Sequence, residues 1–281
     1  MERELWPALY QLVREVGRDV SQKNVIYPPW VIAAVILWAA VHDRPVHWAC
    51  EPKHWSTTRC RPLELPSAST ISRRARRLSV FWRELEARCR QSQWRGVLSF
   101  VDGKPLFVGG CTKDPDARRG YGAGGFGWGY KLHAVWSNRC LPEGWDVTPR
   151  NASEPVVAQA LMTTLPAGGY LLADGNYETN PLAEAAGRAG YQLVAAPRRS
   201  NAGKGHRRHS GFRLRGLELQ TRSFGQRLFR ERYRIELTFA HATSFGGGLA
   251  TLPPWVRRLH RVRTWVWAKL LINAVRILTK H

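Results

Sequence analysis

The sequence has few acidic residues, no long hydrophobic run and only a small, scattered set of cysteines. Its 281 residues include 21 Asp and Glu against 43 Lys and Arg, a formal net charge of +22. The five cysteines are odd in number and lack CxxC spacing, which argues against a disulfide framework. The most apolar run, residues 31–41, is shorter than the roughly 20 residues of a membrane-spanning helix, and the N-terminus has no apolar signal core. These absences predict an intracellular protein without a membrane partner.

The excess of positive charge indicates what the protein binds. Arginine dominates the basic residues, and its planar guanidinium binds phosphate oxygens in a bidentate manner. Nucleic acid is therefore the leading partner. An anionic membrane surface, or the arginine usage of a high-GC genome, would account for the same charge without nucleic-acid binding.

Two further patterns are weaker than they look. One is a group of His and Cys residues whose spacing matches no familiar zinc motif, so we expect loop residues there: His47, Cys50, His54 and Cys60. The other is the GxGxxG pattern of residues 122–127, inside the glycine-rich segment 109–129. A dinucleotide fingerprint must follow a strand and open a helix, whereas a strand-like run follows here. We therefore expect a mobile loop beside the active site and no nucleotide cofactor.

Residues 1–92 are predicted to form a small helical domain. An amphipathic helix comes first, a Pro-Pro pair interrupts the chain, and an apolar helix follows over residues 30–41. A further short helix, capped by Ser67 or Ser69, carries arginines near its start. This is typical of the recognition helix of a helix-turn-helix domain, although a solvated basic face is the alternative. The DNA-binding candidates in this part are Arg73, Arg74, Arg76 and Arg77.

Residues 93–281 are predicted to form an α/β domain. Strands are expected at residues 97–102, 105–109, 130–137, 140–148, 169–173 and 191–196, and helices at residues 153–164 and from a cap at Asn180. Antiparallel-capable strands followed by alternating helices and strands form the order of an RNase H-like mixed sheet flanked by helices. A basic insertion at residues 197–216 and an amphipathic C-terminal helix at residues 256–278, expected to pack against the sheet, complete the domain.

Three carboxylates stand where packing alone does not explain them. Glu236 falls on the apolar side of the helical pattern of residues 229–240, and a buried carboxylate costs several kcal/mol unless a cation meets it. Asp102 and Asp174 each end a strand-like run and precede a glycine. Oxygen ligands of this kind select Mg²⁺ or Mn²⁺. The alternatives are a hairpin turn at Asp102, a polar strand end at Asp174 and an ion pair between Glu236 and Arg232.

Four motifs surround these carboxylates in order: VDGK at residues 101–104, GYKLHAV at 129–135, LADGNYETNPL at 172–182 and RYRIELTF at 232–239. With them, residues 95–280 resemble the catalytic domain of bacterial insertion-sequence DDE transposases. Many members of that family also carry a Tyr and a Lys around the glutamate, and Phe229 and Thr243 stand at those places here.

The resemblance implies a transposase that binds the ends of a mobile DNA element and catalyses strand cleavage and strand transfer. Asp102 would bridge two Mg²⁺ (or Mn²⁺) ions, with Asp174 and Glu236 holding one each. Water would be the first nucleophile, and the freed 3′-hydroxyl would then attack target DNA. The expected partner is double-stranded DNA, both terminal inverted repeats and target. We expect a homodimer to bind it in the cytoplasm, in association with the bacterial nucleoid.

Other basic residues are candidates for contacts with DNA phosphates. The candidates expected beside the metal ions are Lys104, Lys131, His133 and Arg232. The glycine-rich segment adds Arg118 and Arg119. The basic insertion adds Arg198, Arg199, Lys204, Arg207 and Arg208. Each has a plain alternative as a surface charge or a packed strand residue. Two other functions also remain open: a non-catalytic DNA-binding or regulatory protein derived from a transposase, and a metal-dependent nuclease without strand transfer.

Overall fold

The computed structural model describes residues 2–20, 25–91, 93–109, 112–122, 124–166, 168–197, 209–249 and 251–280. The chain divides into two compact units. The helical unit comprises Met1–Gln93 and His241–His281, and the sheet unit comprises Trp94–Ala240. The sequence places a boundary between residues 92 and 93 but groups the C-terminal helix with the second domain, whereas the structure groups that helix with the N-terminal helices. Within the described residues, no helix combines the length and apolarity needed to cross a membrane.

The helical unit is built around one wholly apolar helix. Its helices are α1 (Glu2–Asp19), α2 (Pro29–Val41), α3 (Val46–Ala49), the 3-10 helix η1 (Pro52–Trp55), α4 (Ala68–Ala75), α5 (Ser79–Gln91) and α11 (Leu259–Leu278). Pro29 begins α2, where its fixed φ suits the first helical turn. Residues 31–40 of α2 are all buried, because α1, α3, α4 and α11 pack around it. A helix that is hydrophobic on every side requires such enclosure.

The C-terminal helix α11 completes this helical core. The Trp267 ring stacks on Trp82 of α5 at a centroid distance of 3.8 Å. The buried Lys269 ammonium donates to the Ala40 carbonyl and to the Asp43 carboxylate, at 2.6 Å each. These partners come from the N-terminal helices and the turn after α2. The buried side of α11 thus has aromatic and polar partners within the helical unit. The sequence-based expectation that this helix packs against the sheet stays a prediction, because these contacts describe the helical unit alone.

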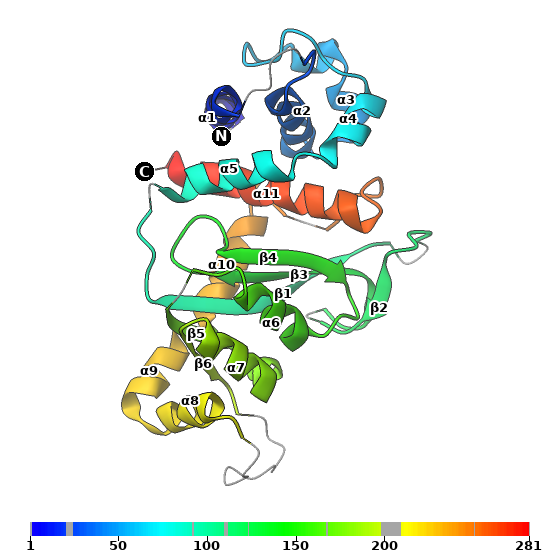
Figure 1. The fold of residues 1–281 in the computed structure, drawn as a ribbon. Coiled ribbons are helices and arrows are strands. Elements are labelled where there is room, and N and C mark those ends of the chain that lie inside the picture. Colours follow the sequence, from blue (N-terminus) through cyan, green and yellow to red (C-terminus); the bar gives the residue numbers. More distant parts are fainter. Residues whose placement is uncertain are drawn as a thin grey trace. The chain divides into compact units, whose positions relative to one another are not determined.

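The sheet unit contains a six-stranded mixed sheet (Figure 1). Its strands are β1 (Leu98–Phe107), β2 (Arg118–Gly120), β3 (Gly127–Trp136), β4 (Gly144–Pro149), β5 (Gly169–Ala173) and β6 (Tyr191–Ala195). The order is β2-β3-β1-β5-β6, and β4 also pairs with β3. The pairs that involve β3 are antiparallel, whereas β1–β5 and β5–β6 are parallel. Antiparallel strands followed by two parallel strands confirm the mixed α/β fold predicted from the sequence.

Helices cover the sheet and supply the rest of the core. They are α6 (Glu154–Met162), the 3-10 helix η2 (Gly175–Tyr177), α7 (Asn180–Arg188), α8 (Gly211–Thr221), α9 (Ser223–Arg230) and α10 (Tyr233–Thr243), whose last residues belong to the helical unit. Side chains from α6 and α7, such as Ala158 and Leu182, pack with Val101, Val135 and Leu171 of the sheet. The cap of α7 is Thr179, one residue before the predicted Asn180: its hydroxyl accepts from the Leu182 N–H at 3.4 Å.

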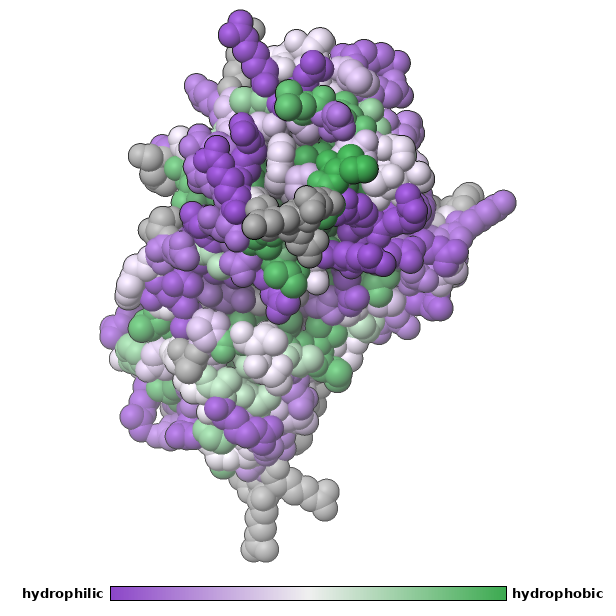
Figure 2. All heavy atoms as spheres, turned by 45° about the horizontal axis from the view of Figure 1, so that its top comes forward, coloured by the Kyte–Doolittle hydropathy of each residue, from purple (hydrophilic) through white to green (hydrophobic). Residues whose placement is uncertain are grey.

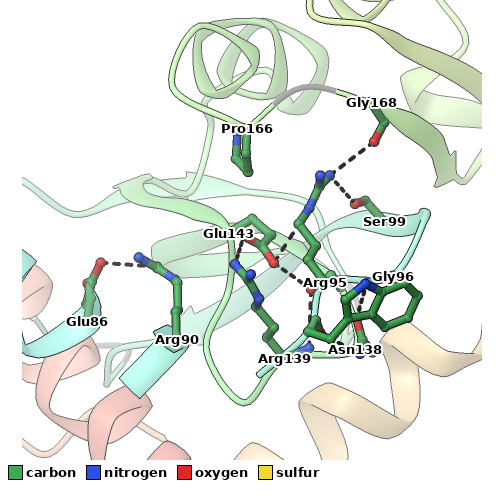
Figure 3. A network of polar contacts seen from close by, with 12 residues as sticks. Glu86, Arg90, Arg95, Gly96, Ser99, Asn138, Arg139, Glu143, Pro166 and Gly168 are labelled. Carbon is green, nitrogen blue, oxygen red and sulfur yellow. Dashed lines mark hydrogen bonds and ion pairs between the residues drawn. The ribbon is translucent and has the colours of Figure 1, made fainter. Parts of the chain in front are cut away.

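A polar network fixes the beginning of β1 (Figure 3). The Arg95 guanidinium donates to the Gly168 carbonyl at 3.2 Å and pairs with the buried Glu143 carboxylate at 3.8 Å. It also donates to the Tyr191 hydroxyl of β6. Asn138, after β3, accepts from the Gly96 N–H at 2.6 Å. Because a one-residue slip would turn every side chain of β1 to the other face, these contacts set which residues of β1 face the site.

Candidate active site

Asp102 lies inside β1 and not at its tip. It pairs with Ala134 of β3, and the antiparallel pairing continues without interruption to Phe107. The two separate strands predicted at residues 97–102 and 105–109 are therefore one strand, and a hairpin turn at Asp102-Gly103 is excluded. The Asp102 carboxylate accepts from the Gly103 N–H at 2.7 Å.

Asp174 follows directly after β5 and caps η2, where its carboxylate accepts from the Asn176 N–H at 2.8 Å. In the parallel pairing of β1 with β5, Phe100 is opposite Leu172. Asp102 and Asp174 each come two residues later. They therefore stand at the same distance beyond the last paired residues, Asp102 still within β1 and Asp174 just after β5 ends.

The site concentrates negative charge. Burial raises the pKa of Asp102 to about 6, and the nearby carboxylates of Asp174 and Glu154 raise it further, against the Gly103 hydrogen bond and the positive charge of Arg232. At neutral pH these carboxylates repel one another in a partly desolvated setting. A bound cation would relieve that repulsion, so this part of the site fits a divalent ion.

Glu236 does not occupy the buried position that the sequence pattern indicates. Its side chain is 64 % exposed, and it accepts from Arg232 at 3.1 Å, one helical turn earlier. In α10 the buried side chains are Ile235, Phe239 and Ala242. The alternative of an ion pair with Arg232 is thus the observed state. Among the described residues, no three His, Cys, Asp or Glu side chains lie close enough together to hold one metal ion.

Two residues that the sequence analysis did not single out border the aspartates. Glu154 begins α6, and its carboxylate lies 2.5 Å from the buried Lys131 ammonium. Tyr177 is fully buried after Asp174, and its hydroxyl has no hydrogen-bond partner among the described residues. Burial, together with the charges of Glu154, Asp102 and Asp174, raises the pKa of Tyr177 well above its usual value. The available signal for Glu154 was an acid in the first turn of a predicted helix.

The basic residues predicted beside the metals differ in accessibility. Lys131 is buried in its ion pair with Glu154. His133 is 1 % exposed, its Nε2 lies 2.9 Å from the Thr148 hydroxyl, and burial lowers its pKa to about 4, so the ring is neutral at neutral pH. Lys104 lies over the Phe239 ring at 5.8 Å. Neither Lys131 nor His133 presents a free positive charge to a phosphate. The Lys131 ammonium is paired with Glu154, and the buried His133 ring is neutral.

The remaining candidate contacts lie on other surfaces. Arg73, Arg76 and Arg77 of the α4 region are exposed and Arg74 is half-buried; Ser67 caps this helix by accepting from the Thr70 N–H. Arg118 and Arg119 are exposed on β2, a strand inside the segment expected to be a loop. Residues of the basic insertion lie outside the described part of the chain: Arg198, Arg199, Lys204, Arg207 and Arg208.

The two weak sequence motifs carry no site in the described residues. The ring of His54 stacks on Trp48 at 4.4 Å, and the Cys50 thiol donates to the Val46 carbonyl at 3.3 Å. These contacts are packing within a short helical loop. Gly127, the last glycine of the GxGxxG pattern, begins β3 and not a helix.

Comparison with known proteins gives three results. Residues 94–272 match the family model of the transposase DDE domain. No curated protein matches the chain at a significant level. Among solved structures, the chain is similar to the piggyBac transposase in a cryo-EM structure of its synaptic complex with hairpin DNA, at 13 % identity and a TM-score of 0.34. That match covers 71 % of this chain and 49 % of the other, so the chain spans about half the length of this relative.

The family match coincides with the structural site. It begins at Trp94, the first residue of the sheet unit, and contains Asp102, Asp174 and Glu236. It also continues into α11 of the helical unit. Because the matched segment makes up more than half of the chain, the protein belongs to the transposase DDE domain family.

Proposed function

We propose that the chain is a transposase that binds the ends of a mobile DNA element and catalyses strand cleavage and strand transfer. The observation that carries this proposal is that Asp102 and Asp174 each come two residues after Phe100 and Leu172, the last paired residues of the parallel strands β1 and β5. Family membership supports it independently, because the matched segment includes both residues. The expected substrate is double-stranded DNA, both the terminal repeats of the element and its target.

The residues present fit Mg²⁺ or Mn²⁺. Asp102 and Asp174 offer oxygen ligands only, which suits hard divalent ions. When two such ions are bound, they activate the attacking oxygen and stabilise the leaving oxygen of a phosphodiester transfer. Asp102 would serve as the shared ligand, because the negative charges of Asp174 and Glu154 both act on its carboxylate and raise its pKa. In this role it must remain ionised, which a cation favours.

Glu236 would join the site when DNA binds. Arg232 borders the site, since its positive charge acts on Asp102, and it also holds Glu236. A DNA phosphate would compete for the Arg232 guanidinium, because guanidinium–phosphate pairs are strong charge-assisted contacts. The released Glu236 carboxylate could then turn toward the aspartates. This exchange gives the exposed Glu236 a route from its Arg232 partner to the aspartates.

Surface charge supports DNA as the partner. The chain carries a net charge of +22, and hydrophilic side chains cover much of the face seen in Figure 2. The exposed arginines of the α4 region would contact the element ends, and those of β2 would contact nearby DNA. We further propose that two copies assemble on the paired ends of the element. The alternatives are a DNA-binding regulator without catalysis and a nuclease without strand transfer.

The test uses DNA that carries the inverted repeats flanking the coding region. We expect Mg²⁺-dependent cleavage at the repeat ends, followed by joining to a second DNA. Asp102→Asn and Asp174→Asn should abolish both steps while DNA binding persists, and the exposed Glu184→Gln should leave them unchanged. Binding without cleavage by the wild type would favour the regulator, and cleavage without joining would favour the nuclease. Full activity in either aspartate variant would remove that residue from the site.

A further inference from the structure

A short antiparallel ribbon extends the sheet beside β1, and the proposed function does not use its tip. We call it the wing and define it by its described residues 112–122 and 124–128. In it, β2 pairs with the beginning of β3, from Arg118 opposite Gly129 to Gly120 opposite Gly127. Figure 1 shows β2 at one end of the sheet, next to the start of β3.

Two aromatic side chains stand exposed at the tip of the wing. Tyr121 is 77 % exposed and Phe126 is 56 % exposed. Their ring centroids lie 4.8 Å apart with an interplanar angle of 47°, so the two exposed rings contact each other. Exposed apolar rings are costly to hydrate, and two of them gathered on a polar ribbon mark a contact surface.

Positive charge flanks these rings. Arg118 and Arg119 are both exposed on β2. The Arg119 guanidinium lies over the Trp128 ring at 5.4 Å, and this cation–π contact restrains it. Exposed rings combined with guanidinium groups match the surfaces that bind single-stranded nucleic acid, where bases stack on the rings and phosphates meet the cations.

The base of the wing is fastened to the sheet. The Tyr130 hydroxyl of β3 donates to the buried Asp114 carboxylate at 2.6 Å. Arg150, which is 1 % exposed, donates to the Gly125 carbonyl and lies over the Phe107 ring at 3.9 Å. The hydrogen bond from the buried Arg150 guanidinium to the Gly125 carbonyl holds the tip of the wing in place. The rings are therefore presented on a fixed support, which lowers the ordering entropy lost on binding.

The wing is placed to meet DNA that is bound at the aspartates. Its base is at Gly129, which pairs with Phe107, five residues along β1 from Asp102. At a rise of about 3.4 Å per strand residue, this separation is about 17 Å. A DNA strand covers that distance in about five nucleotide steps of 3.4 Å.

We propose that Tyr121 and Phe126 form a stacking platform for unpaired bases of the DNA substrate, with Arg118 and Arg119 binding the adjoining phosphates. The inference rests on the proposed function, because it assigns part of that DNA to this surface. Paired bases cannot reach the rings, since they are stacked within the duplex. The wing therefore selects DNA that is frayed, nicked or single-stranded near the cleavage point.

The test measures binding of the full chain, without divalent cations, to a short duplex and to the same duplex with a single-stranded tail containing 2-aminopurine. We expect the wild type to bind the tailed DNA more tightly and to quench the 2-aminopurine fluorescence. Tyr121→Ser and Phe126→Ser should each weaken binding to the tailed DNA by at least about fivefold, with little change for the duplex. Tyr121→Phe should behave as the wild type, because the ring face and not the hydroxyl makes the contact.

The controls separate this inference from its alternatives. Phe224→Ser removes another exposed ring of the sheet unit, 47 % exposed on α9, and should not alter the preference for tailed DNA. Equal losses for duplex and tailed DNA in the serine variants would overturn the stacking role, as would unchanged binding. Binding to anionic lipid vesicles that depends on the two rings, in place of any DNA preference, would assign the wing to a membrane surface. A wild type that binds neither DNA would instead overturn the proposed function.

Discussion

The Lys131 ammonium lies 2.5 Å from the Glu154 carboxylate, and the two side chains are only 6 % and 15 % exposed. The pair stands beside Gly103, where an added Cβ would come within 2.9 Å of Lys131 and 3.1 Å of Glu154. The glycine after Asp102 thus leaves room for this ion pair under the site. Because the two opposite charges are buried together, each depends on the other for its compensation.

Removing one member of this pair should destabilise the fold strongly. In Glu154→Gln the Lys131 ammonium would stay buried without a counter-charge, and such losses cost about 3 to 5 kcal/mol in the free energy of unfolding. Urea unfolding of the wild type and of Glu154→Gln at neutral pH would measure this loss in the free energy of unfolding. The double variant Lys131→Met/Glu154→Leu should recover much of that loss, because no buried charge remains.

An exposed pair provides the matched control. Glu184 and Arg188 are 47 % and 69 % exposed in an i,i+4 pair at 3.9 Å, so Glu184→Gln should change the free energy of unfolding by less than about 0.5 kcal/mol. A similar small effect for Glu154→Gln would show that the buried pair is solvated in solution.

The Asp102 carboxylate should cost stability at neutral pH. Its folded pKa of about 6 lies above the ordinary value of 3.8, so its favourable contribution is present below pH 3.8 and lost as the pH rises through 6. Asp102→Asn should therefore raise the free energy of unfolding above pH 6, by up to about 3 kcal/mol. Unfolding by urea at about pH 8 and about pH 4 would measure this difference, which should vanish at the acid end. A variant less stable than the wild type at both pH values would contradict it.

The sequence pattern indicated a buried Glu236, and this expectation was wrong for a physical reason. The strand-like run before Asp174 depends on a local pattern and ends where the sequence predicts, whereas the run at Asp102 continues to Phe107 because β3 pairs with it along that length. Glu236 was assigned to the same helical face as Phe239, but the helix begins at Tyr233 and buries Ile235 and Ala242 together with Phe239. The face of a short helix depends on tertiary contacts that periodicity alone does not fix.

Long-range pairing was the other part that the sequence could not supply. Residues 256–278 showed an amphipathic pattern, which predicts a buried face but not the surface it covers. The stack of Trp267 on Trp82 joins residues 185 positions apart in the chain, and only the folded structure reveals it. Likewise the Lys131–Glu154 pair joins a strand to a helix, and the sequence around either residue does not indicate which residue it pairs with.

The neutral state of His133 should be visible by NMR. Its folded pKa of about 4 lies below the usual 6.5, so its contribution to stability is present above pH 6.5 and lost as the pH falls through 4. The ring resonances of His133 in the folded protein should therefore show no protonation between pH 7 and about pH 5, whereas the same residue in urea should titrate near 6.5. Protonation of the folded ring at pH 6 would mean that it is exposed to water.

The position of α11 predicts which unit depends on it. Trp267 is 4 % exposed, so Trp267→Ala should lower the free energy of unfolding by about 3 to 5 kcal/mol. Amide hydrogen exchange should show the loss of protection first in α2 and α5. Trp255→Ala, at a tryptophan 40 % exposed in the same unit, is the control and should have little effect. Loss of protection confined to the strands would instead support packing of this helix on the sheet.

Selection of the DNA ends should depend on the exposed arginines of the α4 region. Ser67 caps this eight-residue helix, and Arg73 and Arg76 are exposed on it or just after it. An arginine that reads a guanine edge contributes about 1 to 3 kcal/mol of discrimination, so Arg73→Gln or Arg76→Gln should reduce the preference for the terminal repeat over random DNA by about fivefold or more. Arg83→Gln, which removes an exposed arginine of α5, should lower both affinities alike, because it changes only the charge. The full chain is needed for this competition assay, since α11 forms part of the same core. If Arg73→Gln and Arg76→Gln both keep the preference of the wild type, specificity resides outside the α4 region.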